Sequence, residues 1–446
     1  MGRLFGTDGV RGLANRDLTA ELALDLAVAA VHILSERGTF AGHRPRAIVG
    51  RDTRISGEFL ESAVVAGLAS AGVDVYRVGV IPTPGVAYLV NSTEADLGVM
   101  ISASHNPMPD NGIKFFARGG VKLDDSLEDA IAARLGEEWE RPLAGEVGRV
   151  IDAAKMVDSY IDHLISSVSA SFSGLTFVID GANGSASRVS PEAFRRLGAE
   201  VIEIATEPNG LNINDGVGST HLEPLISKVK ETKAAAGFAH DGDADRTLMV
   251  VKVDGEAVII DGDFILAILA SHWKVPTVVG TVMSNLGFMK ALNELGIKVE
   301  KTQVGDRYVL ERMLSNEYKL GGEQSGHIIM KDFANTGDGL LTALQLMQVM
   351  SESKSSLQSL AQVMERYPQV LVNVKDVDKS KLSTSAQIAK AISESESKLG
   401  DNGRVLVRAS GTEALVRVMV EAASLDQATK IANELAELVR LELKQV

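Results

Sequence analysis

Three segments of the chain repeat one local pattern: an apolar strand, a polar turn, an amphipathic helix and a second strand. A glycine follows each helix, at Gly72, Gly198 and Gly296, where the left-handed backbone of a helix end favours this residue. This order is typical of parallel α/β units, so we expect an internal triplication, although unrelated βαβ units would produce similar patterns. The expected strands and helices of the three copies cover 47–52, 57–70 and 71–75; 176–181, 191–197 and 198–202; and 277–282, 287–295 and 296–299.

The end of the chain follows a different pattern. Two expected strands at 404–408 and 414–420 precede a helix from about Leu425 whose apolar residues recur at helical spacing. Pro368 disfavours helix at Tyr367, which places a linker there. At roughly 150 residues per domain, 446 residues suggest about three domains, and two to four are compatible with this length. We expect an α/β protein with three related mixed α/β domains and a smaller C-terminal α+β domain, at 1–155, 156–256, 257–368 and 369–446.

The composition excludes several classes of function. The absence of cysteine excludes disulfides, thiolate zinc sites, iron–sulfur clusters and cysteine nucleophiles. A formal net charge of −14 repels phosphate backbones and only 4% of residues are aromatic, so we expect no nucleic-acid partner. The richest apolar stretch, 22–34, is too short and too polar to span a bilayer. We therefore expect a cytoplasmic protein with no membrane partner.

The most specific motif is an apolar strand that runs into a loop of small residues with Ser104 next to His105. We expect the small neighbours to leave the Ser104 hydroxyl open to a substrate. A hydroxyl is a weak nucleophile that needs a base, a metal or an attached phosphate. His105 and Lys114 are candidates for the proton transfer, and Arg11 in a glycine-rich N-terminal loop could lie near a phosphate. An ordinary polar loop is the alternative, and Ser102 is a rival acceptor.

A second motif places Asp241, Asp243 and Asp245 within one turn. Three such carboxylates repel one another unless a cation lies between them, and hard oxygen ligands suit Mg²⁺. An EF-hand would require glycine and an acid at loop positions that hold Arg246 and Lys252, so that interpretation fails. A solvated acidic turn remains the alternative.

Two further motifs offer ligand groups. The loop 321–327 holds Glu323, Ser325 and His327 among glycines, and these side chains can pair with hydroxyl or amino groups. In the other motif, guanidinium groups, hydroxyls and a glycine form a candidate phosphate cradle in an otherwise acidic chain. Each could also be a plain turn. The members of this cradle are Arg408, Ser410, Gly411, Thr412 and Arg417.

Taken together, the motifs resemble those of the α-D-phosphohexomutase superfamily. Ser-Ala-Ser-His-Asn-Pro, Asp-Gly-Asp-Ala-Asp-Arg, Gly-Glu-Gln-Ser-Gly-His and Arg-Ala-Ser-Gly-Thr-Glu occur along the whole chain in the family's order. The N-terminal Phe-Gly-Thr-Asp-Gly-Val-Arg-Gly and Gln324 look like a bacterial subgroup that acts on glucosamine phosphates.

The resemblance implies four domains around a central cleft and a phosphorylated Ser104 whose phosphate binds one Mg²⁺ with the three aspartates. It implies interconversion of glucosamine 6-phosphate and glucosamine 1-phosphate through bound glucosamine 1,6-bisphosphate, for amino sugar and cell-wall precursor synthesis. A small-molecule sugar phosphate is the implied partner, and a homodimer is compatible with the family. The implied roles are acid/base and charge-stabilising groups (His105, Lys114), charge neutralisation near the phosphoserine (Arg11, Arg246), sugar contacts (Glu323, Ser325, His327) and the distal phosphate site (Arg408, Ser410, Gly411, Thr412, Arg417).

Three alternatives stay open on the sequence. A relative of the same superfamily would act on glucose or mannose phosphates. A haloacid-dehalogenase-type phosphatase would use Asp243 as a covalent nucleophile, because Asp243, Asp245 and Thr247 match that family's Asp-x-Asp-x-Thr pattern. A sugar-phosphate sensor would bind the ligand without phosphoryl exchange.

Overall fold

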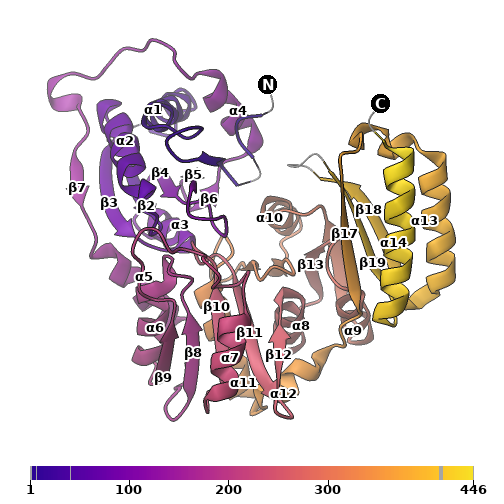
Figure 1. Ribbon diagram of the computed structural model, residues 1–446. Helices are drawn as coiled ribbons and strands as arrows, with labels where there is room; N and C mark the ends of the chain where they lie inside the picture. Colours follow the sequence, from indigo (N-terminus) through magenta and orange to yellow (C-terminus); the bar gives the residue numbers. More distant parts are fainter. Residues whose placement is uncertain (1–2, 7, 41, 411–414, 445–446) are drawn as a thin grey trace. The chain divides into compact units, whose positions relative to one another are not determined.

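A computed structural model describes residues 3–6, 8–40, 42–410 and 415–444 of the chain. The chain divides into two compact units (Figure 1), and the bounds between the four expected domains stay predictions. The larger unit contains three mixed α/β sheets and the smaller unit one antiparallel sheet. The larger unit comprises Met1–Met283 and Ile297–Ala361, and the smaller comprises Ser284–Gly296 and Gln362–Val446.

The first sheet has seven strands in the order β1-β5-β4-β2-β3-β7, with β6 paired to β5. Its elements are β1 (Val10–Leu13), α1 (Ala20–Glu36), β2 (Arg46–Arg51), α2 (Ser56–Ser70), β3 (Asp74–Val80), α3 (Thr83–Ser92), β4 (Leu97–Ile101), β5 (Asp110–Ala117), β6 (Val121–Lys122), α4 (Asp125–Ala133), a 3₁₀ turn (Ala144–Glu146) and β7 (Val150–Asp152).

Helices cover both faces of this sheet because successive residues of a strand point to opposite sides. Val49 of β2 lies in an apolar cluster with Leu60 and Val64 of α2 and with residues of α1. Gly50 faces the other side, where a Cβ would lie 2.8 Å from a methyl carbon of Val86 in α3. The close packing of α3 therefore requires glycine at this position.

The second sheet has the order β12-β11-β10-β8-β9 and the third β14-β13-β15-β16. The elements around the second are α5 (Met156–Ser166), β8 (Thr176–Asp180), α6 (Ala186–Arg196), β9 (Glu200–Ile204), α7 (Glu223–Glu231), β10 (Ala236–His240), β11 (Thr247–Val253) and β12 (Glu256–Ile260). Those around the third are α8 (Gly262–Trp273), β13 (Thr277–Thr281), β14 (Lys298–Thr302), α10 (Asp306–Ser315), β15 (Leu320–Gly322), β16 (Ile328–Met330), α11 (Gly339–Ser353), α12 (Leu357–Leu360) and a 3₁₀ turn (Ala361–Val363).

The three sheets share one four-strand arrangement, which confirms the expected triplication. The equivalent strands are β5-β4-β2-β3, β11-β10-β8-β9 and β16-β15-β13-β14. In each set the first strand is antiparallel to its neighbour and the other pairs are parallel. The connections β4–β5, β10–β11 and β15–β16 are therefore equivalent, and they carry the Ser104 loop, the aspartate turn and the Glu323 loop.

The predicted helix stops are confirmed, with φ of +92° at Gly72, +96° at Gly198 and +72° at Gly296. The strands after them begin two or three residues later than expected, at Asp74, Glu200 and Lys298. The intervening residues still complete the helix end: the N–H of Ala199, for example, donates to the Phe194 carbonyl at 3.1 Å.

Helix α6 begins at Ala186 instead of the expected 191, and Pro191 lies inside it. The N–H of Ser185 donates to the carbonyl of Gly242 at 2.8 Å. A contact remote in sequence therefore supports the start of this helix, which a local rule about proline does not detect.

The smaller unit contains the antiparallel sheet β17-β19-β18, and α13 and α14 cover one face of it (Figure 1). Its order of elements confirms the expected α+β module. Asn285 caps α9, and its side-chain amide donates to Glu421 and to the Tyr367 carbonyl, so α9 belongs to this unit. The elements are α9 (Leu286–Glu294), β17 (Gln369–Lys375), a 3₁₀ helix (Lys379–Thr384), α13 (Ala386–Leu399), a 3₁₀ turn (Gly400–Asn402), β18 (Arg404–Ala409), β19 (Leu415–Glu421) and α14 (Leu425–Glu442).

Among the helices that the structure describes, none combines the length and the apolar character needed to cross a bilayer.

Candidate active site

The Ser104 loop follows β4 in the middle of the first sheet. Ser104 has φ of +52°, and its Oγ donates a hydrogen bond of 2.6 Å to Oδ2 of Asp241. Nδ1 of His105 lies 3.5 Å from the same Oγ. Ser104 is fully buried, contrary to the expectation of an open hydroxyl, because the aspartate turn of the second sheet covers it. The structure thus joins the serine motif to the aspartate motif.

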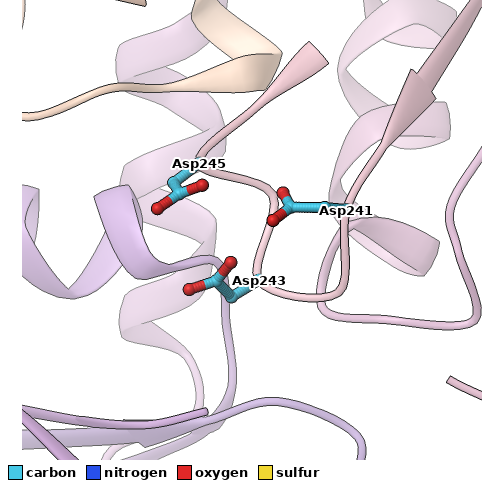
Figure 2. Close-up of side chains that lie close together, drawn as sticks. All are labelled: Asp241, Asp243 and Asp245. Carbon is cyan, nitrogen blue, oxygen red and sulfur yellow. The ribbon is translucent and has the colours of Figure 1, made fainter. Parts of the chain in front are cut away.

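Asp241, Asp243 and Asp245 lie on the turn between β10 and β11, and Figure 2 shows their carboxyl groups gathered together. One oxygen of each lies within 4.8 Å of the others, and all three residues are buried. Among the described residues, Oδ1 of Asp243 and Oδ1 of Asp245 have no hydrogen-bond partner. Buried acceptors without partners around a shared space are suited to a hard divalent cation such as Mg²⁺.

The pKa values of Asp241 and Asp243 are shifted in opposite directions. Burial, followed by repulsion from Asp245 and Asp243, holds the pKa of Asp241 well above its usual range. Burial would also raise the pKa of Asp243, but the Lys114 ammonium outweighs it, so that pKa is lowered. Thr83 of α3 contributes to this effect by donating 2.6 Å to Oδ2 of Asp243. The turn thus combines Asp243, which Lys114 keeps ionised, with Asp241, whose ionisation burial and its neighbours oppose.

Lys114 of β5 connects the N-terminal loop to the aspartate turn. Its Nζ lies 2.7 Å from Oδ2 of Asp8 and 2.7 Å from Oδ2 of Asp243. Burial lowers the pKa of Lys114, but the two carboxylates outweigh burial and raise it, so the ammonium is retained. Arg11 pairs with Asp8 and donates to Asn106 at 3.2 Å, which brings a second cation beside the serine loop.

His105 and Arg246 complete the surroundings of Ser104. Nε of Arg246 lies 3.6 Å from Oδ1 of Asp245. Burial and then repulsion by Arg246 and Arg11 lower the pKa of His105 to about 4. The imidazole of His105 is therefore neutral near pH 7 and a weaker base than an ordinary histidine.

The loop between β15 and β16 contains the three residues expected to contact a sugar. Oε1 of Glu323 accepts from the N–H of Gly305 at 2.9 Å, and Oγ of Ser325 is buried without a partner among the described residues. His327 instead contacts Asp245 at 3.5 Å and accepts from the N–H of Gly337 at 3.1 Å. Ser325 thus presents an unused donor, while His327 supports the aspartate turn.

In the smaller unit, Arg408 and Arg417 face each other across β18 and β19. Burial and the Arg417 charge lower the pKa of Arg408, and Nε of Arg408 has no partner among the described residues. The N–H of Ser410 donates to the Leu415 carbonyl at 2.9 Å, which closes the connection between the two strands. Two like charges facing each other suit an anion. Gly411 and Thr412, two further members of the cradle, lie outside the described residues.

Several polar and charged partners of the site were not predicted from the sequence. Nζ of Lys122 lies 2.5 Å from Oδ1 of Asp8 and also pairs with Asp306 of α10, which connects the first sheet to the third. Asp8 lies in the glycine-rich N-terminal motif, so its position in the sequence could have identified it as a site residue. Thr83, Lys122 and Asp306 are isolated polar residues with no pattern around them, so no local signal identifies them.

The models of four domains of one protein family match this chain. Models of phosphoglucomutase/phosphomannomutase α/β/α domains I, II and III match residues 2–141, 158–255 and 261–367, and the model of the C-terminal domain matches residues 371–438. The chain belongs to the phosphoglucomutase/phosphomannomutase family.

Within this family, curated relatives of this chain include phosphoglucosamine mutases. The one from Streptomyces griseus is 60% identical over 454 residues, which cover 99% of this chain and 100% of the relative. A family protein from Burkholderia thailandensis has the same fold, with a TM-score of 0.80, 23% identity and coverage of 98% of this chain and 97% of that chain. Aspergillus fumigatus N-acetylphosphoglucosamine mutase, solved with GlcNAc-6P and magnesium, has a TM-score of 0.68, 16% identity and coverage of 98% and 95%.

Proposed function

We propose that the chain is a phosphoglucosamine mutase that interconverts glucosamine 6-phosphate and glucosamine 1-phosphate with Ser104 as the phosphoryl carrier. The observation that carries this proposal is the 2.6 Å hydrogen bond from Oγ of Ser104 to Asp241 in the buried aspartate turn. A phosphoryl group on this oxygen replaces the hydroxyl proton and adds acceptor oxygens beside the three carboxylates. Such a site needs a cation, and the partnerless oxygens of Asp243 and Asp245 are available to hold one.

The reaction consists of two phosphoryl transfers. First, the bond between phosphorus and Oγ of phosphorylated Ser104 breaks, a bond to sugar O1 forms, and the O1 proton ends on Oγ. The bound glucosamine 1,6-bisphosphate then reorients, so that its 6-phosphate faces Ser104. Finally, the bond between phosphorus and O6 breaks, the phosphoryl group returns to Oγ, and the serine proton ends on O6. Atoms and charge balance, and the net change is an isomerisation.

The residues around Ser104 suit these transfers, which require mainly positioning and neutralisation of negative charge. We assign acceptance of the sugar hydroxyl proton to His105, which is neutral, whereas Lys114 stays protonated and stabilises charge. Mg²⁺ held by Asp241, Asp243 and Asp245 would supply the largest local positive charge. We assign Arg11 and Arg246 to charge neutralisation as well.

The remaining predicted residues bind the sugar phosphate. We assign Glu323 and Ser325 to the sugar hydroxyls, and the unused Ser325 hydroxyl supports this role. We assign the distal phosphate to the cradle of the smaller unit, where the facing Arg408 and Arg417 support anion binding. The magnesium and GlcNAc-6P bound by the Aspergillus fumigatus enzyme fit the same ligand classes. Amino sugar metabolism in the cytoplasm and a homodimer remain part of the proposal.

The test is intact and tryptic mass spectrometry of the purified protein during turnover. We expect one phosphate on the peptide with Ser104, its loss on mixing with excess glucosamine 6-phosphate, and its return with glucosamine 1,6-bisphosphate. Hydroxylamine should leave this phosphate in place, because an aspartyl phosphate is labile to it and a phosphoserine is not. A peptide that stays unmodified throughout turnover would refute the proposal. Relative rates with glucosamine, glucose and mannose 6-phosphates then establish the sugar preference.

A further inference from the structure

Arg54 is a fully buried arginine whose guanidinium group holds the Ser104 loop through main-chain carbonyls. Its Nη2 donates to the carbonyls of Ser104 at 3.0 Å and Asn106 at 2.8 Å, and its Nη1 donates to the Pro107 carbonyl at 2.6 Å. Its Nε donates to Oδ2 of Asp52 at 2.9 Å. The fixed fork of an arginine suits such a set of acceptors, whereas a lysine offers a single nitrogen.

The N–H of Ser104 is anchored to the same ion pair. It donates to Oγ of Ser102 at 3.0 Å, and that hydroxyl donates to Oδ2 of Asp52 at 2.5 Å. Both main-chain polar groups of Ser104 are therefore connected to the Asp52–Arg54 pair, one through Ser102 and the other directly.

The second sheet adds a further anchor through Asn214. The Asn214 side-chain amide donates to the Ser104 carbonyl at 2.8 Å and to the Asn106 carbonyl at 3.1 Å. Gly242, inside the aspartate turn, allows this carbonyl to approach closely, since a Cβ there would lie 2.6 Å from the carbonyl oxygen. The Ser104 carbonyl is thus held from the first and the second sheets at once.

These contacts explain the backbone of Ser104. Its φ of +52° lies in the left-handed region, which a serine adopts only when its surroundings impose it. In this conformation the side chain meets Asp241. If the carbonyl were released, the residue would relax to a negative φ and its Oγ would leave the aspartate turn.

We propose that Arg54 and Asn214 are positioning residues that hold Ser104 in the left-handed conformation required for phosphoryl transfer. This inference rests on the proposed function. Among the described residues, neither side chain hydrogen-bonds to the carboxylates of Asp241, Asp243 and Asp245, and Arg54 and Asn214 act through the Ser104 main chain.

The test compares Asn214→Asp and Arg54→Lys with Thr53→Val as a matched control. Asn214→Asp keeps the side-chain size and tolerates the positive φ of +57°, but it removes the amide donors and points a carboxylate at two carbonyls. Thr53→Val is also isosteric and also removes a buried bond between the two sheets, from Thr53 to the Asn183 carbonyl at 2.6 Å, yet it leaves the Ser104 loop intact.

The measurements are kcat and KM for glucosamine 6-phosphate, the single-turnover rate of Ser104 phosphorylation by glucosamine 1,6-bisphosphate, and melting temperature. We expect Asn214→Asp and Arg54→Lys to lower kcat and the phosphorylation rate at least tenfold with KM within twofold of wild type. We expect Thr53→Val to lower the melting temperature and to leave kcat, KM and the phosphorylation rate unchanged. Wild-type kcat in Asn214→Asp, or an equal loss of kcat in Thr53→Val, would overturn the inference.

Two features keep this test decisive. If Arg54→Lys does not fold, Asn214→Asp decides alone, because Asn214 is smaller than Arg54 and slightly more exposed, at 8% against 0%. A wild-type protein without phosphate on Ser104 would defeat the proposed function, whereas a phosphorylated, active wild type with an equally active Asn214→Asp would defeat only the positioning role.

Discussion

Oγ of Ser104 donates a hydrogen bond of 2.6 Å to Oδ2 of Asp241, although 137 positions separate the two residues. Ser104 lies on the β4–β5 connection of the first sheet, and Asp241 lies on the equivalent β10–β11 connection of the second. The repeated fold therefore brings equivalent loops together, and one loop supplies the hydroxyl while another supplies the carboxylates. This relationship determines which substitutions should stop the reaction and which should only weaken it.

Ser104→Ala should abolish turnover, because it removes the oxygen that carries the phosphoryl group. Ser102→Ala should lower kcat by no more than about tenfold, because it removes a hydroxyl that supports the Ser104 N–H, a loss of order 1 kcal/mol. Steady-state kinetics with glucosamine 6-phosphate and circular dichroism of both variants check this expectation. Equal and total loss of activity in two folded variants would instead assign the phosphate to Ser102.

Asp243→Asn should weaken Mg²⁺ binding at least tenfold and remove activity, because the aspartate turn loses an ionised carboxylate. Isothermal titration calorimetry with MgCl₂ measures the binding independently of turnover. Asp180→Asn is the matched control: this carboxyl is buried at the end of β8 and accepts from main-chain N–H groups of Ala182 and Gly218. Normal turnover of Asp243→Asn in excess chelator would contradict the metal assignment.

Lys114→Met should destabilise the protein by about 3–5 kcal/mol, because it leaves buried Asp243 and half-buried Asp8 without their shared ammonium. Lys230→Met, which breaks an exposed pair with Glu256 at 2.9 Å, should cost less than about 1 kcal/mol. Thermal unfolding of both variants gives the comparison, and Asp8→Asn should partly restore Lys114→Met. Similar melting temperatures for the two lysine variants would show that the buried lysine is dispensable for stability.

Asp338→Asn should change how stability depends on pH. Asp338 caps α11 and accepts from Tyr160 at 2.8 Å, and burial raises its pKa from 3.8 to about 6. The folded state therefore binds more protons than the unfolded state between about pH 4 and 6, so wild-type stability falls as pH rises through this window, by roughly 3 kcal/mol. Asparagine does not titrate.

The melting temperature of Asp338→Asn minus that of wild type should therefore increase by a few degrees from pH 4 to pH 7. Groups that titrate in both proteins cancel in this difference. A difference that stays constant across the window would show that the Asp338 pKa is not raised.

Much of the fold was predictable from the sequence because its signals are local. The helix stops at Gly72, Gly198 and Gly296 have the expected positive φ, and the order of elements in the last module is confirmed. The start of α6 was not predictable from local preferences, since a main-chain bond between Ser185 and Gly242 supports it.

The candidate site likewise contains some residues that were predictable from the sequence and others that were not. The Ser104 and aspartate motifs were recognisable because small residues, a hydroxyl and three close carboxylates form short patterns. Thr83, Lys122 and Asn214 were not, because each is a single polar residue in an ordinary stretch. Their importance comes from the residue that they meet: Thr83 meets Asp243, and Asn214 meets the Ser104 carbonyl.

By itself, the sequence determined the repeated strand–helix–strand units, the loops that carry reactive side chains, and the chemical character of those loops. These properties depend on hydrophobic alternation, turn residues and the spacing of like charges, which act over a few residues. The tertiary structure alone decided that Asp241 covers Ser104, that Lys114 joins Asp8 to Asp243, and that Arg54 and Asn214 share one carbonyl. Packing of the sheets sets the distances between loops remote in sequence, and no short-range preference contains those distances.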